Sequence, residues 1–261
     1  MRDICEILEV NRSSFYYQPS ESPSEAVLLA EIENLAGAYP RYGYRRITQM
    51  LQRQGYTVGT RRVARLMREN HLSVSVKRAC RTTQSLQGEK PWSNLIENLE
   101  VSREDQVWVA DITYVRLKGR FIYLAVLMDV FTRMIKAWQI RQHLNQSLTL
   151  KPLEEAFCHS VPEIHHSDQG VQYLSNAYVA TLQAHDVEIS VARRGRPWEN
   201  GYAERLIRTL KEEEVYLNDY QNIHEAREHI GHFITQVYNY KRPHSALGYL
   251  TPMEFQRKTL S

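Results

Sequence analysis

Apolar positions follow a helical repeat in one early segment of the chain. Two apolar stripes flank a tight connection between Gly55 and Gly59, and Thr60 is the expected N-cap of the second helix. The stripes consist of Ile47, Met50 and Leu51, and of Val63, Leu66 and Met67. This pattern predicts a helix-turn-helix whose second helix could enter a DNA major groove. A shorter helical pair is expected within residues 4–17, and the pattern does not decide which pair reads bases.

The repeat changes to that of β-strands after residue 105. Three β-branched and aromatic runs cover residues 106–117, 120–132 and 133–142, and their short connections predict an antiparallel meander. The expected elements after them are a helix from about Asn145, a strand ending within residues 163–170, a helix over 174–185, a strand over 187–193 and a helix after residue 200. The order β-β-β-α-β-α-β-α predicts a mixed α/β fold. Residues 81–105 interrupt both repeats and are expected to be a linker or extended arm.

Charge is strongly segregated along the chain. Residues 1–40 have two basic and seven acidic side chains, net −5, whereas residues 41–81 have eleven basic and one acidic, net +10. The candidate DNA-binding residues in the basic segment are Arg45, Arg46, Arg61, Arg62, Arg65 and Arg68. Residues 82–261 have 20 basic and 22 acidic side chains, net −2. We interpret the basic segment as a polyanion-binding module that is joined to a domain with a different function. The alternative is that its basic residues form a solvated helical face.

Composition narrows the class of protein further. The chain has 261 residues, of which 43% are hydrophobic and 24% charged, as in ordinary globular proteins. No apolar run reaches the roughly 18 residues of a membrane span, and the N-terminus lacks the pattern of a signal peptide. The 3 cysteines are widely spaced and form no CxxC pair. We therefore expect a cytoplasmic protein without a cysteine zinc site.

Three acidic residues stand out by their positions in the predicted elements. Asp111 lies in an apolar strand, where an unpaired carboxylate would be costly. Asp168 follows a strand and precedes Gly170, although an aspartate in such a loop is weak evidence alone. Glu204 lies at the edge of an apolar helical stripe. Three carboxylates from two strands and a helix can converge on Mg²⁺, which prefers hard oxygen ligands.

The helix that contains Glu204 has further charged residues. Arg208 and Lys211 share the stripe of Glu204 and are candidates for contacting DNA phosphates. Glu212 is expected on the far side of the helix. The remaining glutamates of this stretch are expected to be solvated or at the helix start; they are Glu199, Glu213 and Glu214.

Several short motifs resemble those of a known family, and these matches are more specific than residue spacing alone. They are "YPRYGYRRI", "RRVARLMRENHL", "WVADITYV", "LAVLMDVFTRMIKAW", "HHSDQGVQY", "RGRPWENGYAERLIRTLKEE" and "YNYKRPHSALGYLTPMEF", in family order. The chain resembles the second-frame product (OrfB) of bacterial insertion sequences of the IS-three family, whose catalytic domain is similar to retroviral integrases. The resemblance implies an RNase H-like integrase core, a mixed five-stranded sheet with helices, preceded by a small all-α helix-turn-helix domain.

The resemblance also implies a domain organisation and a catalytic triad. The expected segments are a helix-turn-helix region over 1–80, the linker over 81–105, the catalytic core over 106–220 and a C-terminal helical element over 221–261. The DDE triad maps onto Asp111, Asp168 and Glu204, with 35 residues between the last two as in the family pattern. Asp129 matches the family outside the triad and is interpreted as structural support. In the closing element, His244 could contact DNA or pack internally.

The implied activity is DNA transposition. Two Mg²⁺ ions, for which Mn²⁺ can substitute, would assist cleavage at the transposon ends and attack by the exposed 3′-hydroxyl, through a circular intermediate. The expected DNA partners are the terminal inverted repeats and target DNA. The expected protein partners are further copies of the chain and a first-frame (OrfA) product, which could also be fused to it. The expected location is the cytoplasm, on the nucleoid when DNA is bound. Two alternatives stay open from the sequence: a noncatalytic DNA-binding regulator, and a metal-dependent nuclease without strand transfer.

Overall fold

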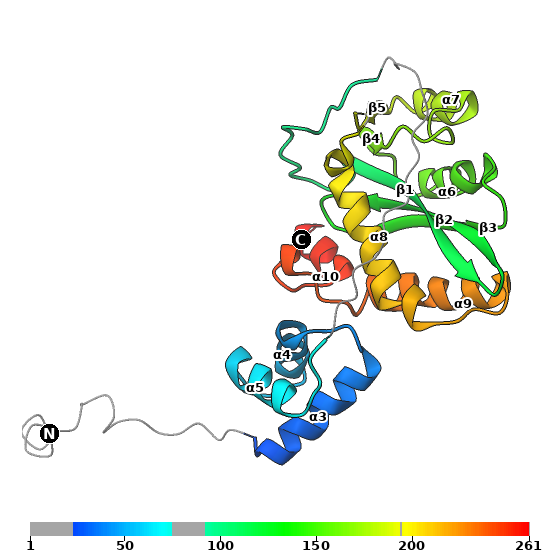
Figure 1. Cartoon of the computed structure of the whole chain (residues 1–261). Helices are drawn as coiled ribbons and strands as arrows, with labels where there is room; N and C mark the ends of the chain where they lie inside the picture. Colours follow the sequence, from blue (N-terminus) through cyan, green and yellow to red (C-terminus); the bar gives the residue numbers. More distant parts are fainter. Residues whose placement is uncertain (1–22, 75–91, 194, 261) are drawn as a thin grey trace, which may run out of the picture. The chain divides into compact units, whose positions relative to one another are not determined.

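The computed structural model describes residues 23–74, 92–193 and 195–260. Two compact units make up the chain, residues 1–76 and residues 77–261, and each is described by itself (Figure 1). The helical pair expected within residues 4–17 lies outside the described residues. No helix in the described ranges is long and apolar enough to cross a membrane.

Within its described residues, 23–74, the first unit contains three helices around one small core. Helices α4 (Tyr44–Arg53) and α5 (Thr60–Glu69) are the predicted helix-turn-helix, and Gly55 adopts a φ of 91° at the turn. The expected cap was wrong: Gly59 is the N-cap and Thr60 is already helical. Helix α3 (Glu25–Ala38) was not predicted. The core includes Leu28, Ile32, Leu35, Ile47, Leu51, Val63, Leu66 and Met67.

The second unit is built on a sheet of five strands. They are β1 (Val107–Leu117), β2 (Arg120–Asp129), β3 (Ile135–Arg141), β4 (Ile164–Ser167) and β5 (Glu188–Val191), in the order β3-β2-β1-β4-β5. The first three strands pair antiparallel, as predicted for a meander, and β4 and β5 add in parallel to β1. Gly119 permits the tight turn between β1 and β2, since its φ is 78°.

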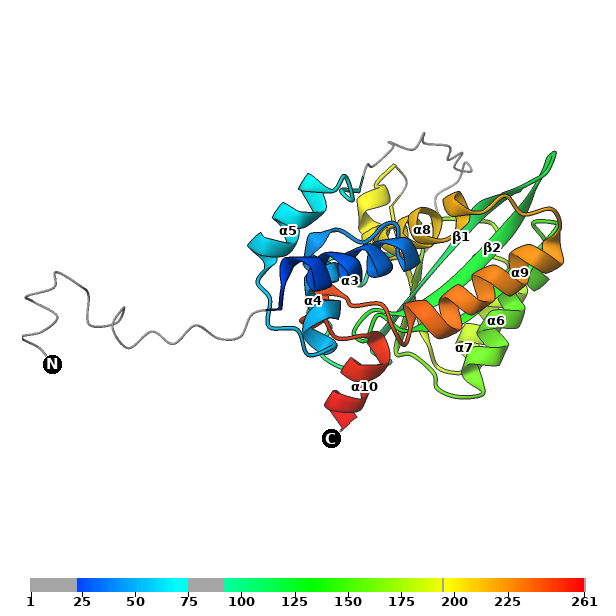
Figure 2. The same cartoon turned by 90° about the horizontal axis from the view of Figure 1, so that it is seen from below.

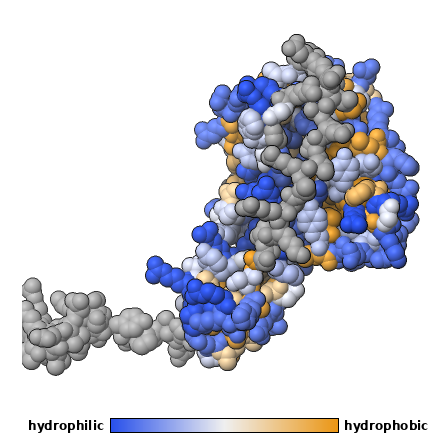
Figure 3. All heavy atoms as spheres, viewed as in Figure 1, coloured by the Kyte–Doolittle hydropathy of each residue, from blue (hydrophilic) through white to orange (hydrophobic). Residues whose placement is uncertain are grey.

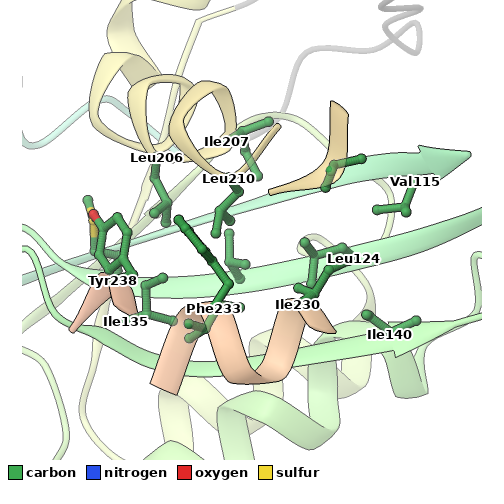
Figure 4. Packing of buried hydrophobic residues seen from close by; sticks show 14 of the residues in the cluster. Val115, Leu124, Ile135, Ile140, Leu206, Ile207, Leu210, Ile230, Phe233 and Tyr238 are labelled. Carbon is green, nitrogen blue, oxygen red and sulfur yellow. The ribbon is translucent and has the colours of Figure 1, made fainter. Parts of the chain in front are cut away.

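Helices cover both faces of this sheet (Figure 1, Figure 2). On one face pack α8 (Gly201–Glu213) and α9 (Ile223–His232), and on the other pack α6 (Ser147–Phe157) and α7 (Asn176–Ala184). Alternation along β1 supplies both cores: Val107 and Val109 face α8, whereas Trp108 and Ala110 face α6 and α7. Figure 4 shows Leu206 and Leu210 of α8 pointing toward Phe233. Full burial of one such leucine contributes roughly 1.5–3 kcal/mol.

Two further segments complete the second unit. Residues 92–105 run without helix or strand, and Ile96, Leu99 and Val101 pack against the α8 face, so this part of the expected linker is an extended arm on the core. In the described residues after α9 come a π-helix (Phe233–Tyr238), a short 3₁₀ turn (Ser245–Leu247) and α10 (Pro252–Leu260). Hydrophilic residues predominate on the face shown in Figure 3, with hydrophobic residues between them.

Candidate active site

Strand pairing places two of the predicted acids side by side. Strands β1 and β4 are parallel, and Val109 is the register partner of His166. Continuing this register by two residues pairs Asp111 with Asp168, which directly follows β4. Because side chains alternate along a strand, both aspartates lie on the face that carries Val109, the face covered by α8.

Asp111 is in an unfavourable electrostatic position. It is half-buried in β1, and the Ile112 N–H donates a hydrogen bond of 2.7 Å to its Oδ1. Burial, together with the negative charges of Asp168 and Glu204, raises the pKa of Asp111 to about 8. The Lys211 ammonium acts in the opposite direction. A divalent cation would relieve the repulsion between these carboxylates.

Asp168 is held by the turn that follows it. The Gly170 N–H donates a hydrogen bond of 2.9 Å to Asp168 Oδ1. A Cβ at position 170 would lie 2.9 Å from the same oxygen, so a larger residue would push the carboxylate aside. Burial also raises the pKa of Asp168, although the hydrogen bond from Gly170 opposes this.

Glu204 lies in the first turn of α8, on the same side of the sheet as the aspartates. Asn200, just before the helix, is buried and donates from Nδ2 to the Ala110 carbonyl at 3.4 Å, which fixes the helix start beside β1. Ala203 and Ile207 bury the adjoining stripe, while Glu204 itself is exposed. Within the described ranges, no three His, Cys, Asp or Glu side chains lie close enough together to hold a metal ion. Glu204 therefore acts on Asp111 electrostatically but does not complete a cluster in this conformation.

The cations predicted on α8 have different surroundings. Lys211 is half-buried; burial lowers its pKa, and the Asp111 carboxylate opposes that change. Arg208 is exposed. A phosphate near Asp111 and Asp168 would thus have a lysine beside it, and an arginine at the solvent side of the same helix.

The predicted arginines of the first unit also divide into two groups. Arg45, Arg61 and Arg68 are exposed. Arg62 donates to the Pro23 carbonyl at 2.9 Å, and Arg65 forms ion pairs with Glu69, at 2.9 Å, and with Glu25. A further contact is internal: the Arg46 guanidinium lies 5.0 Å from the centre of the Tyr42 ring.

Two residues near the site were missed from the sequence. His166 is buried, and its Nδ1 lies 2.8 Å from Ser190 Oγ on β5. Burial lowers the pKa of His166 to about 4, so its ring is neutral at pH 7. The second is Asn200, the anchor of α8. Strand alternation could have identified His166, because it lies two residues before Asp168 on the same face.

The expectation that Glu213 and Glu214 are solvated was wrong, whereas Glu199 lies just before α8, as expected, and is also paired. Glu213 is 8% exposed and accepts two hydrogen bonds from Arg242, at 2.7 and 2.8 Å. Glu199 is 3% exposed and accepts from Arg193 Nε at 2.6 Å. Glu214 accepts from the Tyr220 hydroxyl at 2.9 Å. The partner of Glu213 lies 29 residues further along, that of Glu199 on the preceding loop and that of Glu214 six residues after it, and the apolar stripe indicates none of these pairings.

Two residues outside the set of three predicted acids are structural. Asp129 is fully buried at the end of β2 and accepts hydrogen bonds from the Asp105 N–H at 2.9 Å and from the N–H and hydroxyl of Thr132 at 2.6 and 2.7 Å. His244 of the closing element is buried, with its ring 4.9 Å from that of Tyr238 in an edge-on arrangement. Its role in this structure is therefore packing.

Comparisons with known proteins agree with this architecture. Residues 101–197 and 185–252 each match a family model described as an integrase core domain, and residues 24–79 match an HTH-like domain. The chain is 30% identical to the putative transposase InsK of insertion sequence element IS150 from Escherichia coli (strain K12), over 98% of this chain and 93% of the relative. It is 28% identical to the transposase InsF of insertion sequence IS3A from the same organism, over 100% and 95%.

A solved structure shows the same fold at low sequence identity. It is the simian T-cell lymphotropic virus intasome in complex with PP2A regulatory subunit B56 gamma, with a TM-score of 0.53 and 16% identity. The match covers 86% of this chain and 74% of the other. At this identity the likeness concerns the fold alone, and it confirms the predicted integrase-like core.

Proposed function

The chain belongs to the IS-three family of insertion-sequence transposases, and from this premise we propose that Asp111, Asp168 and Glu204 are its catalytic triad. It is a DNA transposase, a polynucleotidyl transferase with an integrase core and a helix-turn-helix domain. The observation that supports the triad best is the β1–β4 register, which places Asp111 and Asp168 side by side beneath α8. Glu204 is the acidic residue in the first turn of that helix.

The donor set fits divalent metal ions. Carboxylate oxygens are the ligands that Mg²⁺ and Mn²⁺ prefer, and burial together with the negative charges of Asp168 and Glu204 raises the pKa of Asp111, which a bound cation would lower. Asp111 and Asp168 would hold the metal from the sheet. Glu204 is exposed, so its side chain can turn toward the aspartates without disturbing the core. When bound, one or two Mg²⁺ ions supply activation of the attacking oxygen and neutralisation of charge on the leaving oxygen.

The remaining residues position the DNA. Lys211 beside Asp111 is suited to hold a phosphate oxygen of the strand to be cut, and Arg208 to contact the backbone further along. Gly170 keeps the Asp168 carboxylate in place, and Asn200 fixes the start of α8. The same arrangement serves both steps, water attack at a transposon end and attack by the resulting 3′-hydroxyl on another phosphodiester. Because two ends must meet, we propose that at least two copies of the chain act together on the inverted repeats.

The test compares Glu204→Gln with Glu212→Gln, an identical change on the same helix. Purified full-length protein would be incubated with labelled terminal inverted-repeat DNA in Mg²⁺, Mn²⁺ or chelator, and cleavage and joining would be measured separately from DNA binding. We expect Glu204→Gln to reduce both reactions to the level seen with chelator while binding is unchanged, and Glu212→Gln to behave as the wild type. Full activity of Glu204→Gln would contradict the triad, and cleavage without joining by the wild type would identify a nuclease.

A further inference from the structure

An exposed tryptophan lies just ahead of the helix that carries Glu204. Trp198 is 67% exposed, the highest value for any large hydrophobic residue in the part of the chain that the structure describes. It belongs to a 3₁₀ turn (Pro197–Asn200) that continues directly into α8, since the Gly201 N–H bonds to the Trp198 carbonyl. Leaving so large an apolar ring in water forgoes the stabilisation that its burial would give.

The backbone beneath this ring is firmly anchored. Glu199, the next residue, is 3% exposed and accepts hydrogen bonds from Arg193 N at 2.7 Å and Arg193 Nε at 2.6 Å. Arg196 Nη1 lies 3.5 Å from the same carboxylate. Asn200 on the other side is tied to the Ala110 carbonyl. The turn therefore holds Trp198 outward on fixed backbone, beside the strand of Asp111.

A second aromatic residue and two cations lie on the same segment or against it. Tyr202, in the first turn of α8, is 41% exposed, and the Arg133 guanidinium carbon lies 4.4 Å from its ring centre. Arg196 has a side chain 46% exposed. Exposed aromatic faces next to arginines are the combination that binds single-stranded nucleic acid, by stacking on bases and pairing with phosphates.

We propose that Trp198 and Tyr202 form a stacking platform for an unpaired DNA base next to the phosphate that is cut. The proposal rests on the proposed function, because it places the strand to be cut beside Asp111 and Glu204. Paired bases offer no accessible ring face except at a duplex end, so the platform requires the terminal base pairs to open. Its role is to hold the opened strand in the site, which any base can satisfy.

A fluorescent base reports the stacking directly. DNA ends with 2-aminopurine at the unpaired or terminal positions would be bound in chelator to full-length wild type, Trp198→Ala, Trp198→Phe and Phe121→Ala. Phe121 is a matched control, 59% exposed at the β1–β2 turn. We expect the wild type, Trp198→Phe and Phe121→Ala to quench the fluorescence, and Trp198→Ala to leave it unquenched.

Cleavage on two substrates separates stacking from general damage. On fully paired ends, Trp198→Ala should cleave about 10- to 100-fold more slowly than wild type, the loss of one stacked base. On ends whose terminal two base pairs are mismatched, the deficit should largely disappear. Unchanged quenching by Trp198→Ala, or an equal loss on both substrates, would overturn the proposal and would favour a protein partner for this surface. If the wild type cleaves neither substrate, the proposed function fails and the platform with it; normal wild-type cleavage with a normal Trp198→Ala refutes the platform alone.

Discussion

Replacing Asp111 by asparagine is expected to stabilise the metal-free protein at alkaline pH while abolishing its activity. The folded-state pKa of Asp111 is about 8, against an ordinary value near 4, chiefly because of burial and then because of Asp168. For an acid whose pKa is raised by folding, the folded state retains a proton that the unfolded state has released. The stability of the wild type should therefore fall as the pH rises from about 4 to about 8.

The size of this effect can be bounded. Each pH unit across that window costs about 1.4 kcal/mol, so four units set a ceiling of about 6 kcal/mol. Asp111 is only half-buried, and solvent reduces the effect, so we expect Asp111→Asn to gain about 2–3 kcal/mol at pH 8 and well under 1 kcal/mol at pH 5. For a domain of this size, such a gain raises Tm by about 4–12 °C.

Tryptophan fluorescence is the suitable assay. All 4 tryptophans, Trp92, Trp108, Trp138 and Trp198, lie in the second unit, so the signal reports its unfolding. Wild type and Asp111→Asn would be compared in chelator at pH 5, 6.5 and 8, with the exposed Asp219→Asn as a control. Millimolar Mg²⁺ should then stabilise the wild type and not Asp111→Asn. A gain that does not grow with pH would refute the electrostatic reasoning, and equal stabilisation of both proteins by Mg²⁺ would refute the assignment of Asp111 as a ligand.

Two further predictions concern other parts of the chain. Glu213→Ala should lower the unfolding free energy of the second unit by about 3–5 kcal/mol, because it leaves the buried Arg242 charge without this carboxylate. The double variant Glu213→Leu with Arg242→Met should recover much of that stability. A loss under about 1 kcal/mol for Glu213→Ala, measured by the same fluorescence assay, would contradict this. In the first unit, Arg61 and Arg68 are exposed, and replacing both by alanine would remove two contacts to DNA phosphates. The slope of the logarithm of the DNA-binding constant against the logarithm of the salt concentration should therefore decrease in magnitude by about 2. Arg65→Ala, which breaks internal ion pairs, should change the slope less, and anisotropy titrations at several salt concentrations will distinguish the two variants.

Elements with strong local signals were predictable from the sequence. The meander follows from strand-like runs joined by the Lys118–Gly119 turn, and the order of later helices and strands agrees with the structure. Helix α3 was missed although Leu28, Ile32 and Leu35 repeat at helical spacing after Ser24, whose side chain accepts a hydrogen bond from Val27 N.

Pairings between distant residues were not predictable in the same way. Glu213 falls at the end of the apolar stripe of α8, where the sequence gives it no partner, yet it pairs with Arg242, which is 29 residues further along. The partner of Asp111 likewise depends on which strands pair. Spacing in the sequence does not give the β1–β4 register, whereas the family resemblance selects the same two aspartates by motif. Local patterns thus define elements, and tertiary pairing decides which charges are buried.

Two residues lie in environments that are unusual for their side-chain types, and both are in the same region of the fold. Asp111 is an acid in a buried strand, and Trp198 is an exposed aromatic; Asn200, between Trp198 and Glu204, bonds to the residue before Asp111. A chain selected for stability alone would remove both, because each replacement by a residue suited to its environment should stabilise the fold. Local inconsistency concentrated at one place is typical of functional sites. Asp111→Asn therefore tests more than the role of Asp111 as a metal ligand. A variant that gains stability and loses transposition would show that the unfavourable burial of the Asp111 carboxylate is retained for catalysis.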